Sequence, residues 1–372
     1  MLETFINSEK LNDYWRNIDK KILFCFLTLF FLGIFFSFSS TSSLAGERLN
    51  KDFYFFFSKH LVFSLLAISL MITISYVDIS ILKKSIIPLF LFSFILLILV
   101  PILGIEVKGA KRWIDLFFFR LQPIEIIKPF FVLTTATIIC SFKNKNVNHS
   151  YLISLCLLSL IIVLLLNQPD IGQSILLITT WISIVFISGI KISYIILLII
   201  FLTLSSILLF FLFPSKFSYI FLRLTTFMDP SKGDSFQTDK ALAAIKQGGL
   251  KGQGMGEGIL KESVPEAHTD YIIAVITEEF GSFVSIGVIT IFLYISYKII
   301  KICINNSDDL TKISLCGLSS LLIFQTFIHI GVNTSLLPTT GMTLPFLSYG
   351  GSSLIGSSIL AGVILNLTKN RY

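Results

Sequence analysis

Ionisable residues that could move a proton gather where the longest hydrophilic stretch of the chain meets an apolar segment. Glu266, His268 and Asp270 lie in the polar run 265–271, and an apolar segment follows at once. At such an edge a side chain borders water on one side and hydrocarbon on the other, which shifts pKa values and suits proton transfer. We expect Asp270, at the entry to the apolar helix, to carry the chemistry, whereas a lone histidine such as His268 is more often a structural hydrogen bonder.

A second charged group precedes another apolar segment. Glu125 and Lys128 are three residues apart, on one face of a helix whose first turn is marked by Pro123. They could simply pair, but an ion pair inside a membrane helix costs desolvation, so nearby cations favour capture of an anion. The alternative is anchoring at the membrane interface by basic residues and Trp113. The nearby cations are Lys108, Lys111, Arg112 and Arg120.

Three further stretches could line a site. The 214–270 loop, which includes Arg223, holds seven cations and suits a partner with phosphate groups. Asp170 ends a short turn, where turn chemistry and substrate lining are both open interpretations. The stretch 333–353 contains two prolines and three glycines, which force non-helical backbone at membrane depth, so we expect it to form the wall of a cavity. Glu278 and Glu279 lie about two turns into the next helix, where a structural salt bridge and catalysis both stay open.

Composition fixes the setting of these residues. Of 372 residues 54% are hydrophobic and 14% are charged, far from the roughly 25% charged typical of soluble domains. The chain is therefore predicted to be an all-α integral membrane protein, one domain over 1–372 with a bundle of about ten transmembrane helices of ordinary spanning length. Strands are unlikely in these runs, since none alternates apolar with polar residues. The expected spans are 22–40, 58–77, 86–104, 122–141, 151–167, 173–189, 192–213, 271–297, 313–333 and 350–367.

Other patterns carry less chemistry. The first span lacks a cleavage site and is expected to stay as an anchor. The five cysteines have no paired spacing, so neither disulfides nor a zinc site is indicated. The glycine-rich stretch 248–258 lacks the Gly-Lys-Ser/Thr of a nucleotide-binding loop. It indicates either a turn system or a backbone that must approach a ligand closely. The small residues after Ser353 suit close packing of helices.

The basic residues predict the orientation. With the N-terminus inside, 14 of the 29 Lys and Arg residues fall on the cytoplasmic side and, outside the long loop, eight fall on the other. Short loops decide orientation more than long ones. Both the 1–21 tail and the C-terminus are therefore expected in the cytoplasm, and the 214–270 loop outside. Because this basic loop is expected on the outer face of the membrane, nucleic acid is not expected as its partner.

Taken in order, five of these motifs resemble the shape, elongation, division and sporulation (SEDS) family of bacteria. They are Lys111–Trp113, Gln122–Glu125, Gln168–Asp170, Pro265–Asp270 and Leu337–Ser353. The sequence is more similar to the division branch than to the rod-shape branch, because Ala267 stands where the latter usually has arginine. The runs 341–345 and 39–47 favour the same branch. Ile124 and Gln173 depart from the family pattern, which commonly has serine and a smaller residue there.

The resemblance implies an activity and a setting. Family members polymerise lipid II, a disaccharide-pentapeptide on undecaprenyl diphosphate, into β-1,4-linked glycan at the outer face of the bacterial inner membrane. A division-type member implies septal wall synthesis with a class B penicillin-binding protein transpeptidase and other division-complex membrane proteins. A lipid II flippase, a rod-shape-type elongation polymerase and a pure scaffold are the alternatives.

On this interpretation Asp270 is the general base that deprotonates the acceptor sugar. Lys111, Arg112 and Lys128 stabilise the leaving diphosphate, and Glu125 orients Lys128. A divalent cation, Mg²⁺ or Mn²⁺, is left open as a cofactor. Substrate contacts are expected from Trp113, Arg223, Glu266, His268 and Ser348.

Overall fold

The structure is a computed structural model. It describes residues 8–39, 54–107, 109–117, 119–142, 147–212, 218–229 and 235–369. Lys108 and most of the 39–47 run, both used in the sequence analysis, lie outside these ranges.

All ten predicted apolar segments are helices. Among the described residues, seven helices are long and apolar enough to cross a membrane, and α8 and α14 are shorter apolar helices. The helices are α1 (Ser8–Asn17), α2 (Lys20–Ser39), α4 (Phe55–Tyr76), α5 (Ile79–Leu103), α6 (Pro123–Phe142), α7 (Val147–Asn167), α8 (Ile171–Ile187), α9 (Ile192–Leu212), α10 (Ser218–Met228), α11 (Phe236–Gly248), the short 3-10 helix η2 (Leu260–Ser263), α12 (Ile272–Asn305), α13 (Asp309–Asn333) and α14 (Gly351–Leu367).

A small sheet joins α5 to α6. It consists of β1 (Gly104–Val107), β2 (Ala110–Asp115) and β3 (Arg120–Leu121) in antiparallel order β1-β2-β3. Ile114 pairs with Leu121 and Asp115 with Arg120. Of the predicted apolar runs only 86–104 touches this sheet, with its last residue, Gly104, and the sheet itself was not predicted.

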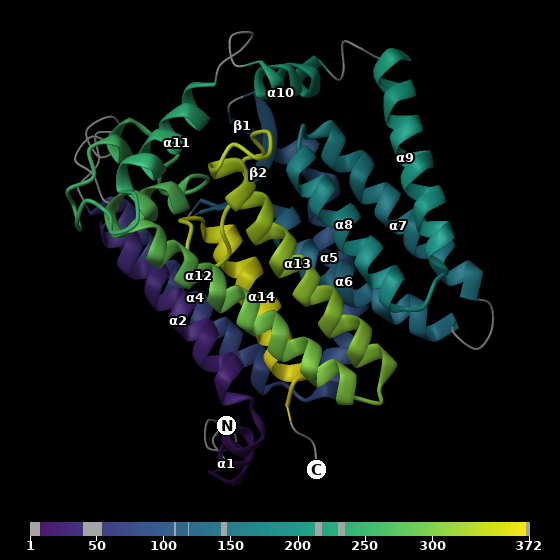
Figure 1. Ribbon diagram of the computed structural model, residues 1–372. Coiled ribbons are helices and arrows are strands. Elements are labelled where there is room, and N and C mark those ends of the chain that lie inside the picture. The colour runs from purple at the N-terminus through teal and green to yellow at the C-terminus, as the bar shows by residue number, and fades with distance from the viewer. Residues whose placement is uncertain are drawn as a thin grey trace.

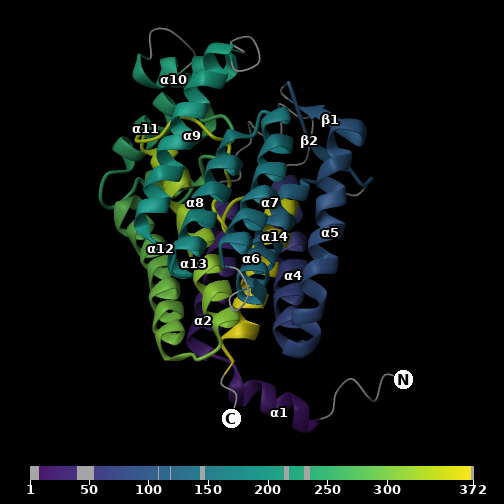
Figure 2. The same cartoon turned by 90° about the vertical axis from the view of Figure 1, so that its right-hand side faces the viewer.

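The bundle is closed around α14. This helix packs against α4, α6 and α13, while α13 also packs against α6, α8 and α12 (Figures 1 and 2). Small residues make the approach close: a Cβ on Gly356 would lie 2.4 Å from the carbonyl oxygen of Glu125, and one on Gly362 would lie 2.8 Å from that of Met71. The small residues of this segment therefore serve helix packing.

The glycine-rich stretch meets α12 backbone to backbone. A Cβ on Gly248 would lie 2.0 Å from the carbonyl oxygen of Thr277, and one on Gly252 would lie 2.2 Å from that of Glu279. Gly281, with φ of 83°, interrupts α12 at the same contact. These glycines bring α11 and the following turns against the helix. The backbone of the glycine-rich stretch therefore lies close to another part of the protein, α12, at these positions.

A buried ion pair holds the next segment. The ammonium of Lys261 contacts the Glu279 carboxylate, whose side chain is 1% exposed. The hydroxyl of Ser39, at the end of α2, also donates to Glu279. The neighbouring Glu278 accepts from the backbone N–H of Leu260 and of Lys261, at 2.7 and 2.8 Å. Both glutamates thus attach the segment before Asp270 to the bundle.

The chain between α13 and α14 is non-helical, as predicted for 333–353. Its anchor is Phe346, which has a φ of 67° and is almost fully buried. The ring of Phe346 packs against Phe26 and Phe30 of α2 and Phe292 of α12, with centroids 5.4, 5.1 and 6.5 Å away. A Cβ on Gly33 would lie 2.4 Å from the Phe346 carbonyl oxygen. This segment is therefore fixed inside the bundle.

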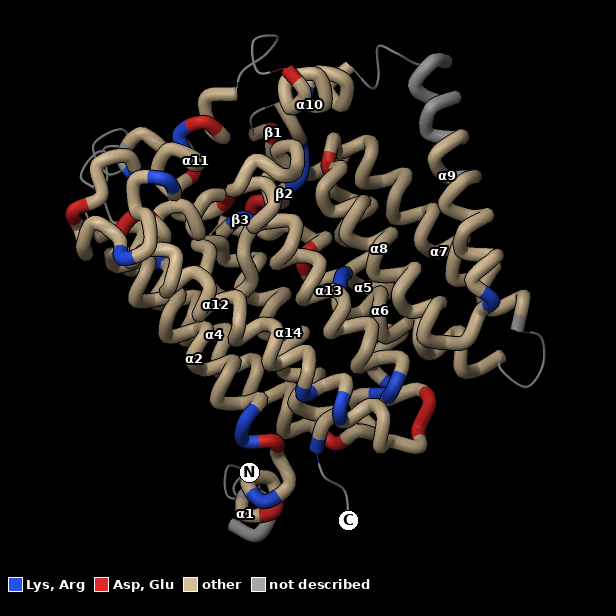
Figure 3. The backbone as a smooth tube through the Cα atoms, in the orientation of Figure 1, with Lys and Arg blue, Asp and Glu red and all other residues tan. Residues whose placement is uncertain are grey.

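Both termini lie at one end of the bundle, and α10, α11 and the sheet lie at the other (Figure 1). Figure 3 shows that most charged residues gather at these two ends. The two termini are thus expected on the same side of the membrane, as in the sequence analysis.

Candidate active site

A cavity of about 760 Å³ opens at the end opposite the termini. Its walls come from α4, the sheet, the first turns of α6 and α14, α8, α10, α11, the 265–271 turn and the non-helical segment after α13. Four carboxylates and four cations face it: Asp115, Glu125, Glu266 and Asp270, and Lys59, Arg112, Arg120 and Arg223. The walls thus combine mixed charge with apolar rings such as Phe63 and Phe119.

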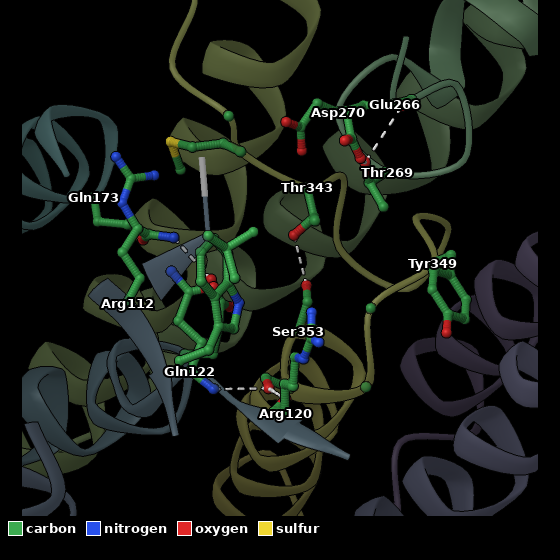
Figure 4. A pocket seen from close by; sticks show the side chains of 18 of the residues that line it. Arg112, Arg120, Gln122, Gln173, Glu266, Thr269, Asp270, Thr343, Tyr349 and Ser353 are labelled. Atoms are coloured by element: carbon green, nitrogen blue, oxygen red, sulfur yellow. Dashed lines mark hydrogen bonds between the residues drawn. The ribbon is translucent and has the colours of Figure 1, made fainter. Parts of the chain in front are cut away.

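The turn that carries Asp270 is held by its backbone. The N–H groups of Thr269 and Asp270 donate to the carbonyl of Glu266, a residue with φ of 57°. The amide of Asn333 donates to the carbonyl of Asp270 at 2.9 Å, and the hydroxyl of Ser348 donates to that of Thr269 at 2.6 Å. Because the main chain is fixed, the carboxyl group of Asp270 is presented to the cavity in one place (Figure 4).

Beside the carboxylate of Asp270 the wall is formed by a glycine, Gly341. Gly341 adopts a φ of 70°, and a Cβ there would lie 3.5 Å from Oδ2 of Asp270. The positive φ favours glycine. The absence of a side chain leaves room for a reacting group beside the carboxylate.

Arg112 and Arg223 line the cavity while bracing its wall. The guanidinium of Arg112 donates to the carbonyl oxygens of Gln168 and Pro169, and its Nε lies 3.9 Å from Oδ2 of Asp170. Arg223 donates to the carbonyl of Thr339 at 3.1 Å. Burial lowers the pKa of Arg223, with the positive charge of Arg112 adding to the effect.

Asp170 is buried behind this wall and does not face the cavity. Its side chain caps α8 by accepting from the N–H of Gln173. Burial raises the pKa of the Asp170 carboxyl, against the opposing effect of Arg112. Of the two interpretations of this turn, the structural one therefore holds.

Below the cavity runs a buried chain of polar side chains. Gln173 donates to Oε1 of Glu125 at 2.7 Å, and Oε2 of Glu125 pairs with Lys128 at 2.7 Å. Lys128 donates to Gln325 at 2.9 Å, and Gln325 donates to the carbonyl of Thr343 at 3.0 Å. Lys128 therefore faces α13 rather than the cavity, and the chain ties α6, α8 and α13 to the non-helical segment.

The structure gathers six of the ten predicted site residues in the cavity wall: Arg112, Trp113, Glu125, Arg223, Glu266 and Asp270. The other four, Lys111, Lys128, His268 and Ser348, do not line it. Lys111 is exposed on β2. His268 stacks on Phe56 with ring centroids 5.3 Å apart, and burial lowers its pKa to about 4.

Sequence reasoning did not single out Lys59 as a site residue, and it named Arg120 only as a member of the cation cluster and Gln237 only as a member of the 214–270 loop. The one signal for Lys59 is a charge one turn inside an apolar helix. Within the described ranges no group of three or more His, Cys, Asp or Glu side chains is placed to hold a metal ion.

An apolar helical bundle with a polar cavity sunk into one end defines a polytopic membrane protein. The chain belongs to the cell cycle protein family of FtsW, RodA and SpoVE, whose model matches residues 19–372. This finding confirms the resemblance to the SEDS family.

Relatives and solved structures agree with the family. A protein of Caulobacter vibrioides named probable peptidoglycan glycosyltransferase FtsW is 32% identical, over 96% of this chain and 91% of its own. A protein of Coxiella burnetii with the same name is 34% identical, over 94% and 95%. These names favour the division branch, as the sequence does.

The fold also matches solved structures. A chain from a structure titled as a peptidoglycan synthase complex that coordinates polymerization and crosslinking has a TM-score of 0.73, with 22% identity over 94% of this chain and 97% of that one. The rod shape determining protein RodA of Thermus thermophilus has a TM-score of 0.67, with 22% identity over 94% of this chain and 96% of that one.

Proposed function

We propose that this chain is a peptidoglycan glycosyltransferase of cell division that polymerises lipid II into β-1,4-linked glycan. The observation that carries the proposal is Asp270, a carboxylate on a fixed turn, facing a cavity that Arg112 and Arg223 also line. The relatives named peptidoglycan glycosyltransferase FtsW support the activity. The fold shared with a chain of a peptidoglycan synthase complex is consistent with it.

In this reaction Asp270 accepts the proton of the attacking sugar hydroxyl. The oxygen bonds to the anomeric carbon of the second substrate with inversion, and the bond from that carbon to the diphosphate breaks. General-base assistance of this kind contributes about 10² to 10⁴ in rate. Arg112 and Arg223 stabilise the negative charge that develops on the diphosphate. The Glu125–Lys128 pair acts from below, by holding the floor of the cavity in place.

The cavity opens on the outer face of the bacterial inner membrane in this proposal. Support comes from the short segments with Lys and Arg at the end where both termini lie, which the positive-inside rule assigns to the cytoplasm. The site then meets lipid II where the disaccharide is exposed, at the division septum.

A crosslinking partner follows from the chemistry, because free glycan strands must be joined through their peptides. The partner proposed is a class B penicillin-binding protein transpeptidase, together with other membrane proteins of the division complex. The solved complex of similar fold, which coordinates polymerization and crosslinking, supports this assignment.

The test is a polymerisation assay with purified full-length protein and labelled lipid II, with and without the transpeptidase. The Asp270→Asn variant should bind lipid II and lose glycan synthesis by about 10² or more. Asp78→Asn is the control, since it makes the same change at an exposed aspartate outside the cavity wall, and it should cost far less. Full polymerisation by Asp270→Asn would refute the role of this residue. Movement of lipid II across vesicles without any glycan would favour the flippase.

A further inference from the structure

The cavity has two groups of cations with different surroundings. In the first group, Arg112 donates to backbone carbonyls at 167–170 and Arg223 donates to that of Thr339. Thr339 is two residues from Gly341, the residue beside the Asp270 carboxylate. Arg223 is therefore tied to the part of the wall beside the general base, and Arg112 is close enough for its charge to lower the pKa of Arg223.

The second group lies on another part of the wall. It consists of Lys59 of α4 and Arg120 of β3, and both line the cavity. Figure 4 shows Arg120 beside Ser353, away from Arg112, which lies beside Gln173. Phe63 of α4 packs against Phe119, with ring centroids 5.6 Å apart, and so joins the two elements that carry this group.

These two cations are free to bind an anion. Within the described ranges neither Lys59 nor Arg120 forms an ion pair, in contrast to Arg112 with Asp170. Lys59 lies over the ring of Phe55 at 4.6 Å. Arg120 is held by its backbone, because its carbonyl accepts from Ser352 at 2.9 Å, and this leaves the guanidinium to the cavity. An arginine fork suits two oxygens of one diphosphate.

An apolar tip adjoins the second group. The turn between β2 and β3 carries Leu116, which is exposed, and Phe117, which is 102% exposed and has a φ of 63°. Phe117 also lines the cavity. An exposed ring next to unpaired cations suits a ligand that is anionic at one end and hydrocarbon at the other.

The proposed reaction needs two such ligands at once. The donor reacts at the sugar carbon bonded to its own diphosphate, so that diphosphate must lie near the reacting atoms. The acceptor reacts through a hydroxyl on the far sugar of its disaccharide, so its diphosphate must lie two sugar rings away from Asp270.

We propose that Lys59 and Arg120 bind the diphosphate of the acceptor, with its prenyl chain leaving past Phe117, while Arg112 and Arg223 bind that of the donor. The inference rests on the proposed function and adds to it the assignment of each substrate to one side of the cavity. Lys59 and Arg120 are binding residues that leave the chemical step to Asp270.

The test uses two lipid II analogues that each play one role. A 4-deoxy analogue lacks the attacking hydroxyl and serves only as donor. A methylene phosphonate analogue, in which carbon replaces the oxygen between sugar and diphosphate, serves only as acceptor. Initial rates of their coupling give a separate KM for each substrate.

Arg120→Gln and Lys59→Gln should each raise the KM for the acceptor analogue about tenfold, the cost of one charge-assisted hydrogen bond, and change the KM for the donor analogue less than about twofold. Arg120→Lys should recover part of the acceptor affinity. Arg223→Gln should raise the donor KM instead. Lys251→Gln, an exposed cation outside the cavity wall, is the matched control and should change neither value.

Equal effects of Arg120→Gln on both substrates, or an effect on the donor alone, would overturn the assignment. No coupling by the unmodified protein with its transpeptidase partner would instead refute the glycosyltransferase function itself. The thermal unfolding midpoint of each variant separates a loss of binding from a loss of folding.

Discussion

Removing the positive charge of Lys261 should destabilise the segment that leads to Asp270. In Lys261→Met the carboxylate of Glu279 stays 1% exposed and loses its counter-ion. It keeps two donors, the hydroxyl of Ser39 and the N–H of Gly256 at 3.2 Å. Breaking a buried ion pair from one side costs about 3 to 5 kcal/mol. Because two donors remain, we expect about 3 kcal/mol, the lower end of that range.

Replacing both partners should cost less than replacing one. In the double variant Lys261→Met with Glu279→Gln neither charge of this pair remains, and the glutamine can still accept from Ser39. A double-mutant cycle should therefore give a coupling of about 2 kcal/mol or more between the two positions. The exposed pair of Lys83 and Asp308, at 3.0 Å, is the control, and Lys83→Met should cost less than about 1 kcal/mol.

The measurement is the free energy of unfolding in detergent micelles, by titration with a denaturing detergent. Glycan synthesis by the same variants shows whether the loosened segment also misplaces Asp270. Our reasoning would be refuted if Lys261→Met cost no more than Lys83→Met. It would also be refuted if the double variant were as unstable as the two single effects added together.

Two further predictions concern backbone and pH. Gly252→Ala should destabilise the protein by well over the roughly 1 kcal/mol expected for Gly256→Ala. Both glycines have positive φ, but only at position 252 would the new Cβ meet backbone, 2.2 Å from the Glu279 carbonyl oxygen. Equal unfolding midpoints of the two variants would contradict this reasoning. Burial lowers the pKa of His268 to about 4 from 6.5, so the unfolded state binds more protons and stability should fall as the pH drops from 6.5 toward 4, by about 3 kcal/mol. His268→Phe keeps the stacking on Phe56 and should flatten that slope in unfolding experiments; an unchanged slope would show that other groups titrate there.

Much of the helical framework could be predicted from the sequence because lipid leaves the backbone few choices. An apolar run of spanning length must form its hydrogen bonds internally, so each of the ten runs is a helix. Most boundaries differ by a few residues, and the largest differences are the start of α5, at Ile79 rather than 86, and the end of α12, at Asn305 rather than 297. The sheet at 104–121 was missed because its strands are short and pair only with one another.

The site was predictable in part for a similar reason. Asp270 and Glu266 follow from charge placed at a membrane edge, but spacing alone could not say which way a charged side chain faces. Lys128 is one helical turn from Glu125, yet it turns toward Gln325 of α13, a contact set by the packing of distant segments. Lys59 reaches the cavity only because α4 packs beside α14.

The burial of Phe346 between α2 and α12 has a consequence for binding. A loop that already lies in its working position gives up little conformational freedom when a ligand arrives, so little of the contact energy is spent on ordering it. Such a loop cannot swing aside like a flap either. The entry and exit of long lipid-linked chains must therefore depend on parts of the protein other than this non-helical segment between α13 and α14.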